Sequence, residues 1–238
     1  MDLGFKDRVV IVAGGTGGLG RAVTLAFLAE GAKTIVTYRA EAEFAALRDA
    51  AGTKSGALEG HTIDVTNEAE VRNLVDGVTA RHGRLDVLVN TVGGYAGGIK
   101  LWDLETKTLE QMLALNLRSG FALARAALAP MLKQKSGSIV NVAAKAAIDH
   151  GGGASAYAAS KAAAVAMMDS LAEDLKGTGV RVNSILPSVI DTETNRKAMP
   201  GANFATWPKP EDIARVVLFL ASDQAKVVHG ASVPVYGA

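Results

Sequence analysis

Short apolar runs alternate with longer amphipathic segments along the whole chain. Several of the runs are apolar throughout and rich in valine and isoleucine, which is typical of strands buried on both faces of a parallel sheet. These runs predict strands over residues 8–13, 34–38, 60–64, 85–90, 138–142, 180–186 and 231–236. Between them, apolar residues recur at helical spacing and predict helices over residues 19–30, 41–51, 68–81, 109–132, 156–176 and 210–222.

This alternation of strands and helices predicts an α/β fold. We expect a doubly wound, mostly parallel seven-stranded sheet of the Rossmann type, with helices on both faces. No linker or change of composition divides the chain, so residues 1–238 are expected to form a single domain. Ligands of such open sheets bind beyond the carboxyl ends of the strands. The residues that follow each predicted strand are therefore the candidates for a site.

Composition narrows the classes of function. Lys and Arg number 25 against 24 Asp and Glu, so no basic excess is available for nucleic acid or an anionic membrane surface. Cysteine is absent, which excludes disulfides, thiol nucleophiles and thiolate metal sites, and no metal site is expected. The apolar runs are too short for a secretory signal or a membrane span. We expect a cytoplasmic protein that acts on a small molecule.

A glycine-rich segment follows the first predicted strand. It reads Ala13-Gly14-Gly15-Thr16-Gly17-Gly18-Leu19-Gly20 and leads into a helix. Glycines allow a tight turn and a close approach of a pyrophosphate, and the helix N-terminus offers free N–H groups. A turn without a ligand is the alternative, but the strand before it and the helix after it favour dinucleotide binding. The expected contacts are Gly14, Thr16, Gly17, Gly18, Leu19 and Gly20.

The ends of the second and third predicted strands bear on the choice between NAD and NADP. An NAD-selective site is expected to place Asp or Glu after the second strand, to accept hydrogen bonds from the ribose hydroxyls. Tyr38 stands there instead, and Arg39 follows it. A guanidinium at this position pairs with a 2′-phosphate, which favours NADP(H) over NAD(H); a solvated surface arginine is the alternative. Asp64 and Val65 are expected near the adenine, although Asp64 is equally placed to cap the next helix.

Polar residues also follow the fourth strand and interrupt a later helix. Asn90-Thr91-Val92-Gly93-Gly94 ends the fourth strand, and its glycines permit close approach to a cofactor; an ordinary turn is the alternative. Asn90, Val92 and Gly93 are the expected contacts. Asn116 lies within an apolar helical stretch and needs partners once buried, so it either holds water at a site or ties down a neighbouring backbone.

Tyr157 and Lys161 stand four residues apart near the start of a predicted helix, a spacing that places them on one face. An ammonium near a phenol favours the phenolate and lowers the tyrosine pKa, which makes the phenol a usable acid near neutral pH. An exposed pair without function is common for this spacing alone. Because the pair follows the glycine turn in the same alternating pattern, we expect both residues to contact cofactor and substrate.

Together these residues resemble the short-chain dehydrogenase/reductase superfamily over nearly the whole chain. Gly14, Gly18 and Gly20 match its glycine motif, with Ala13 in place of a threonine. The segment from Asn90 to Gly93 is similar to its Asn-Asn-Ala-Gly element. The resemblance implies that Asn116 supports a proton relay, that Tyr157 and Lys161 form the catalytic pair, and that Pro187, Val189 and Thr192 lie at the nicotinamide.

One residue departs from the pattern of this superfamily. A serine that polarises the substrate carbonyl is expected 13 residues before the tyrosine, and Ala144 occupies that position. A donor of this kind is typically worth ~3 kcal/mol, so its absence argues against efficient reduction of ordinary ketones. Ser138 and Ser155 stand at other positions in the sequence.

The missing hydroxyl makes the chain similar to the dihydropteridine reductases, which also lack this serine. The segments 143–149, 93–98 and 195–207 carry the similarity. It implies an NAD(P)H-dependent hydride transfer to a quinonoid dihydropterin or a similar conjugated substrate. It also implies that Tyr95, Ala144 and Lys145 line the substrate site. Asn116 and Arg39 depart from that group, which carries an aspartate for NADH.

Two other functions stay open, together with the state of assembly. The first is a generic carbonyl or 3-oxoacyl reductase, for which restoring a hydroxyl at Ala144 raises ketone turnover. The second is a catalytically silent nucleotide-binding regulator, which binds cofactor without turnover. The long alanine-rich helices over residues 109–132 and 156–176 predict a homodimer or homotetramer, with burial inside one domain as the alternative.

Overall fold

A computed structural model describes residues 3–237 of the chain, and its centre is a seven-stranded sheet in the order β3-β2-β1-β4-β5-β6-β7. Every neighbouring pair in the sheet is parallel, which confirms the predicted α/β class and makes the sheet parallel throughout. The strands are β1 (Val9–Ala13), β2 (Lys33–Tyr38), β3 (Leu58–Thr62), β4 (Val87–Asn90), β5 (Gly137–Val142), β6 (Val180–Pro187) and β7 (Ser232–Val235).

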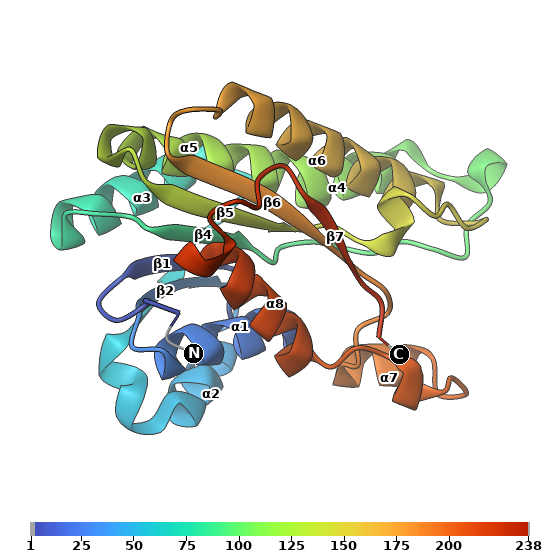
Figure 1. The fold of residues 1–238 in the computed structure, drawn as a ribbon. Helices are drawn as coiled ribbons and strands as arrows, with labels where there is room; N and C mark the ends of the chain where they lie inside the picture. Colours follow the sequence, from blue (N-terminus) through green and yellow to red (C-terminus); the bar gives the residue numbers. More distant parts are fainter. Residues whose placement is uncertain (1–2, 238) are drawn as a thin grey trace.

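Helices cover both faces of the sheet (Figure 1). One face carries α1 (Gly18–Ala29), α2 (Glu41–Ala51) and α8 (Pro210–Ala221). The other carries α3 (Glu68–His82), α4 (Thr106–Leu113), α5 (Ser119–Gln134) and α6 (Ser155–Asp174). A short helix, α7 (Glu193–Ala198), lies apart from both layers near the C-terminus (Figure 1). Across residues 3–237 no helix is both long enough and apolar enough to cross a bilayer.

Two hydrophobic clusters hold these layers together. Side chains alternate across β1, so Val10 and Val12 pack toward α1 and α8 while Val9 and Ile11 pack toward α3 and α5. Each of the four is at most 1 % exposed. Burial on both sides explains why these strands are apolar without interruption in the sequence.

The structure departs from the predicted elements in three places. First, the third strand ends at Thr62 rather than at residue 64, because Asp64 accepts hydrogen bonds from the backbone N–H and hydroxyl of Thr66 and thereby holds a turn. Second, the helix predicted over residues 109–132 is interrupted by one π-helical turn, Ala114–Arg118, which separates α4 from α5. Third, α7 forms at Glu193–Ala198, where the sequence pattern predicts neither a helix nor a strand.

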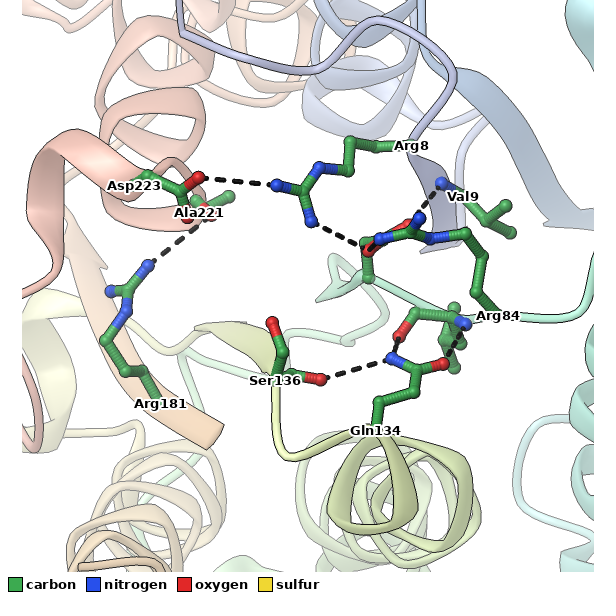
Figure 2. A network of polar contacts seen from close by, with 10 residues as sticks. Arg8, Val9, Arg84, Gln134, Ser136, Arg181, Ala221 and Asp223 are labelled. Carbon is green, nitrogen blue, oxygen red and sulfur yellow. Dashed lines mark hydrogen bonds and ion pairs between the residues drawn. The ribbon is translucent and has the colours of Figure 1, made fainter. Parts of the chain in front are cut away.

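A polar network joins the amino ends of the strands (Figure 2). Its centre is Asp86, which is 5 % exposed and forms ion pairs with Arg8 (3.0 Å) and Arg84 (2.6 Å). The second carboxylate oxygen of Asp86 accepts the backbone N–H of Val9 at 2.8 Å. These contacts fasten the start of β1 to the segment that leads into β4.

Arg181 connects the same end of the sheet to α8 (Figure 2). Its guanidinium donates to the carbonyl oxygens of Leu220 (2.8 Å) and Ser222 (2.9 Å), at the C-terminal end of α8. Carbonyls of a last helical turn lack partners within the helix and carry partial negative charge, so a guanidinium satisfies them well. The amino ends of β1, β4 and β6 are thereby linked to the helix that covers them.

Candidate functional site

The predicted glycine turn connects β1 to α1 and admits no larger residues at its centre. Gly14 has a φ of 75°, in the left-handed region. A Cβ atom at Gly20 would lie 2.1 Å from the carbonyl oxygen of Gly14, and one at Gly15 would lie 2.5 Å from the side chain of Val36. The turn and helix are therefore packed closely onto the sheet, as dinucleotide binding requires.

The N-terminus of α1 is free to receive an anion. Its N-cap is Gly17, which has no side chain to accept the first backbone N–H groups of the helix. Such groups, together with the helix dipole, favour a phosphate. The donors point to the same edge of the sheet as the ends of β2 and β4, as expected for parallel strands.

A groove of about 570 Å³ opens beside this turn, and it brings together residues that follow the first four strands. Nine predicted cofactor contacts line it: Gly14, Thr16, Gly17, Tyr38, Arg39, Asp64, Val65, Val92 and Gly93. The groove is also lined by residues that the sequence pattern does not indicate, among them Thr37, Glu43 and Leu115. The size of the groove, its glycine floor and the uncapped helix fit a dinucleotide.

The remaining predicted cofactor residues lie around the groove without lining it. Leu19, Gly20 and Asn90 are buried and shape the turn from within. Thr192 lies against the glycine turn, because a Cβ atom at Gly18 would meet its Cγ2 at 2.8 Å. Pro187 ends β6 and Val189 follows it, partly exposed. A role for these residues at the nicotinamide stays a prediction.

The groove is also lined by residues at the ends of β2 and β3, which were predicted to bear on the choice between NAD and NADP. Tyr38 stacks on Phe44 with ring centroids 4.7 Å apart, and its hydroxyl donates to Glu41 at 2.6 Å. Arg39 is exposed at the groove. Asp64 does not cap α3: Asn67 does, by accepting the backbone N–H of Ala69 at 3.0 Å. The hydrogen bonds from Thr66 lower the pKa of Asp64.

The side chains of Asn90 and Asn116 are buried, and both form hydrogen bonds with the backbone of the loop after β4. The Asn90 side chain accepts the backbone N–H of Val92 at 3.2 Å and donates to Asn141 at 3.1 Å. Asn116, in the π-helical turn, accepts the N–H of Gly94 at 2.9 Å and donates to its carbonyl at 3.1 Å. Of the two roles expected for Asn116, the structure shows the tie to a neighbouring backbone.

The same asparagine connects this loop to α6. Its amide nitrogen donates to the Ser160 hydroxyl at 2.9 Å, and that hydroxyl donates to the carbonyl oxygen of Tyr157 at 2.8 Å. Asn116 and Ser160 are both buried. The chain of contacts fixes the first turn of α6, and with it the backbone of Tyr157, relative to the loop after β4.

Lys161 is buried beneath that loop. Its ammonium donates to the carbonyl oxygen of Val142 at 3.0 Å, and burial lowers its pKa to about 8. A Cβ atom at Gly93 would lie 3.1 Å from Nζ, so glycine is needed for the loop to pass this close. Lys161 therefore lies directly behind a residue that lines the groove.

Tyr157 is half-buried and faces the loop after β4. Its ring lies edge-on to the ring of Tyr95, with centroids 5.0 Å apart and planes at 76°. Burial, followed by the neighbouring Tyr95, raises the pKa of Tyr157 to about 12. The expectation that Lys161 lowers this pKa is therefore wrong for this structure, because desolvation of the phenol dominates and the ammonium of Lys161 is bonded to Val142.

Three residues were expected at the substrate. Tyr95 is 71 % exposed and lies against Tyr157. Ala144 follows β5 and is 7 % exposed. The Nζ atom of Lys145 lies 3.0 Å from a carboxylate oxygen of Asp149 and 5.2 Å from the ring centre of Tyr236, so this amine is near the carboxyl end of β7. That these three residues touch substrate stays a prediction.

Comparison with known proteins decides the family. The sequence profile described as short chain dehydrogenase matches residues 8–203. This chain belongs to the short-chain dehydrogenase/reductase family. It is therefore an oxidoreductase, as predicted, and the family uses a nicotinamide cofactor.

Relatives in this family align along almost the whole chain. The 3-oxoacyl-(acyl-carrier-protein) reductase FabG of Thermotoga maritima is 31% identical, covering 98% of this chain and 97% of its own. The D-threitol dehydrogenase of Mycolicibacterium smegmatis is 35% identical over 99% of this chain and 94% of its own. A solved short-chain type dehydrogenase/reductase from Mycobacterium ulcerans is 30% identical, with a TM-score of 0.92 over 98% of this chain and 90% of that one.

These relatives are reductases of oxoacyl groups and dehydrogenases of diols. They support the superfamily resemblance but not the narrower similarity to dihydropteridine reductases. The local segments that carried the narrower similarity lie largely in loops, which vary more than the sheet because loops tolerate change. A solved structure described as ElxO with NADP bound shares the fold, with a TM-score of 0.91 at 24% identity and 97% of this chain covered.

Proposed function

We propose that this protein is an NAD(P)H-dependent reductase of a small carbonyl compound, of the generic carbonyl or 3-oxoacyl kind. One observation carries the proposal: Tyr157 and Lys161 lie on α6 beside the loop whose Gly93 lines a dinucleotide-sized groove. Family members that act on oxoacyl and diol groups align along the same length of chain.

The residues that would hold the cofactor follow from the groove. Gly14 and Gly17 would contact the pyrophosphate, Asp64 and Val65 the adenine, and Val92 and Gly93 the nicotinamide side. The cofactor supplies the hydride when bound. Arg39 favours NADP(H), because a guanidinium can pair with the 2′-phosphate.

The phenol of Tyr157 supplies the proton. With a pKa of about 12 it holds that proton throughout the neutral range. The alkoxide oxygen formed by hydride transfer to a carbonyl is a stronger base than this phenolate, so it would take the proton from the hydroxyl of Tyr157.

Lys161 and Asn116 support this phenol in different ways. Lys161 has a pKa of about 8, so its amine both holds and releases a proton close to neutral pH. Asn116 acts through Ser160 on the backbone of Tyr157 and through Gly94 on the loop that approaches it. Asn116 is therefore a positioning residue for the acid rather than a second acid.

A specific observation favours a second candidate substrate. Ala144 leaves no hydroxyl at the place where the family polarises a carbonyl, and Tyr95 presents an exposed aromatic ring next to Tyr157. A conjugated, electron-poor ring such as a quinonoid dihydropterin needs less polarisation than a ketone and stacks on an aromatic side chain. This substrate class is the alternative to a 3-oxoacyl compound.

The two substrates and a silent regulator are separated by one set of assays. NADH and NADPH are first titrated by fluorescence, and cofactor oxidation is then followed with 3-oxoacyl thioesters, simple ketones and quinonoid dihydropterin. Carbonyl turnover supports the main proposal, and turnover of the dihydropterin alone supports the alternative. Binding of cofactor with no turnover of any substrate would make the protein a nucleotide-binding regulator.

The residue at position 144 provides an internal check. In a carbonyl reductase, Ala144→Ser restores a hydrogen-bond donor worth ~3 kcal/mol in transition-state binding, so ketone turnover rises by up to about 100-fold. A matched Ala143→Ser variant, one residue away in the same segment, is expected to show no gain. Loss of turnover in Ala144→Ser would mean that this wall is shaped for a substrate that needs no hydroxyl there.

We also propose that the protein assembles through α5 and α6. These helices enclose a groove of about 390 Å³ whose lining includes Phe121, Leu128, Met167 and Leu171. Phe121 is 42 % exposed, so a large apolar side chain of this groove is available for a second copy of the chain to cover. Light scattering is expected to report a dimer or tetramer, and Phe121→Glu is expected to shift it toward the monomer; a monomeric wild-type protein would contradict this assembly.

A further inference from the structure

Two carboxylates occupy the first turn of α2, and they point to different partners. Glu41 accepts the hydroxyl hydrogen bond of Tyr38 at 2.6 Å. Glu43 accepts the hydroxyl hydrogen bond of Thr16 at 2.9 Å and lines the groove. Thr16 belongs to the glycine turn, so the Glu43 carboxylate reaches across from α2 to that turn. Local sequence patterns do not indicate this contact, because it joins residues 27 positions apart.

The position of Glu43 matters because the two nicotinamide cofactors differ in one group. NADP carries a phosphate on the ribose 2′-oxygen, where NAD carries a hydroxyl. Residues at the end of β2 read this difference: an acidic side chain accepts from the hydroxyl, and an arginine pairs with the phosphate. In this chain Tyr38 stands at the acidic position, and Arg39 supplies the cation.

Glu43, in the first turn of α2, places a carboxylate in the same region. Thr16, Arg39 and Glu43 all line the one groove, so the acid and the cation face the same ligand. A carboxylate repels a phosphate dianion and, through Thr16, also occupies a hydroxyl that would otherwise donate to it. The same carboxylate accepts hydrogen bonds from the hydroxyls of an unphosphorylated ribose at no electrostatic cost.

We propose that Glu43 is a specificity-determining residue that opposes Arg39 and holds down the affinity for NADP(H) relative to NAD(H). This inference rests on the proposed nicotinamide-dependent function of the groove. It makes the preference for NADP(H) a balance between two side chains rather than a property of Arg39 alone.

The test compares Glu43→Gln with Glu41→Gln, a matched control. Both variants remove one negative charge from the first turn of α2, and so both weaken the favourable interaction of that turn with the helix dipole to a similar degree. Only Glu43→Gln removes the carboxylate that faces the groove. Dissociation constants for NADH and NADPH are measured by fluorescence titration or calorimetry, without any substrate.

Glu43→Gln is expected to bind NADPH about tenfold more tightly than the wild type, while its affinity for NADH stays within about twofold. Because Glu43 is exposed, the gain is expected to shrink as salt is added. Glu41→Gln is expected to change the ratio of the two constants by less than about twofold. The opposite variant, Arg39→Gln, is expected to weaken NADPH binding and to leave NADH binding unchanged.

The outcomes separate this inference from the proposed function. If wild-type protein binds neither cofactor, the proposed function fails. If it binds both, but Glu43→Gln leaves the ratio unchanged or changes it no more than Glu41→Gln does, the groove is a cofactor site and Glu43 is not its selectivity element. A circular dichroism spectrum and melting temperature matched to the wild type would show that each variant is folded.

Discussion

The two ends of the sheet both gather arginines and carboxylates, yet they use them in opposite ways. At the amino ends, Asp86 receives two arginines and a backbone N–H, and Arg181 donates to helix carbonyls, around a cavity of only about 60 Å³. At the carboxyl ends, Arg39 and Glu43 border a groove of about 570 Å³. A charged cluster is structural where its members satisfy one another, and it is available to a ligand where they face a common space.

The hydrogen bonding of the backbone shows the same contrast. The C-terminus of α8, at the amino end of the sheet, has its free carbonyls bonded to Arg181. The N-terminus of α1, at the carboxyl end, has no side-chain cap. Free helix ends that are left uncapped beside a groove point to a ligand, whereas capped ones serve stability.

The largest expected effect is on kcat, after removal of the proton donor, Tyr157, at the carboxyl ends of the strands. Tyr157→Phe keeps the ring and its packing on Tyr95 but removes the proton donor, so kcat is expected to fall by about 1,000-fold. Cofactor dissociation constants are expected to change by no more than about twofold, since the hydroxyl contributes little to dinucleotide binding. Tyr95→Phe is the control and is expected to retain most activity. A Tyr157→Phe variant that keeps the wild-type kcat would show that the proton does not come from Tyr157.

Breaking the amino-end network is expected to affect stability alone. Asp86→Asn leaves Arg8 and Arg84 without their shared anion and is expected to cost about 3 kcal/mol of unfolding free energy. The control is Asp223→Asn, which removes the other carboxylate that contacts Arg8 but lies 84% exposed, so its cost is expected to stay within about 0.5 kcal/mol. Urea unfolding measures both, and a loss of cofactor affinity in folded Asp86→Asn would contradict the division between the two ends.

A smaller effect is expected from the pH dependence of stability. Burial lowers the pKa of Lys161 from 10.5 to about 8, so between these pH values the unfolded chain binds more protons at this group than the folded chain. Stability from this group is therefore lowest below pH 8 and is regained as pH rises to 10.5. Relative to Lys161→Met, the wild type is expected to gain on the order of 2 kcal/mol over this interval. Parallel curves for the two proteins would show that the amine is not desolvated.

Most of the fold could be predicted because strands buried on both faces leave an uninterrupted apolar pattern. The π-helical turn at Ala114–Arg118 could not, because its cause is a tertiary contact: Asn116 bonds the backbone of Gly94, which lies on another loop. The early end of β3 has a local cause, the turn at Asp64. The sequence pattern does not distinguish this turn from a continuing strand.

The site divides along the same line. The glycine turn and the ends of β2 and β4 were predictable, because parallel strands bring their carboxyl ends to one edge. The burial of the Tyr157 phenol was not predictable, and it reverses the expected direction of the shift in the pKa of Tyr157. Spacing along a helix places Tyr157 and Lys161 on one face, but it does not show that the amine of Lys161 is bonded to Val142.

Hydrogen exchange with and without NADPH tests most directly whether the carboxyl-end groove is the working site. NADPH is expected to slow amide exchange in the glycine turn, in the loop after β4 and in the first turn of α6, residues 13–20, 90–94 and 155–161. Exchange at residues 134–138 and 179–181, at the amino ends, is expected to stay unchanged. Protection confined to the amino ends, or absent from the glycine turn at saturating NADPH, would contradict this assignment of the site.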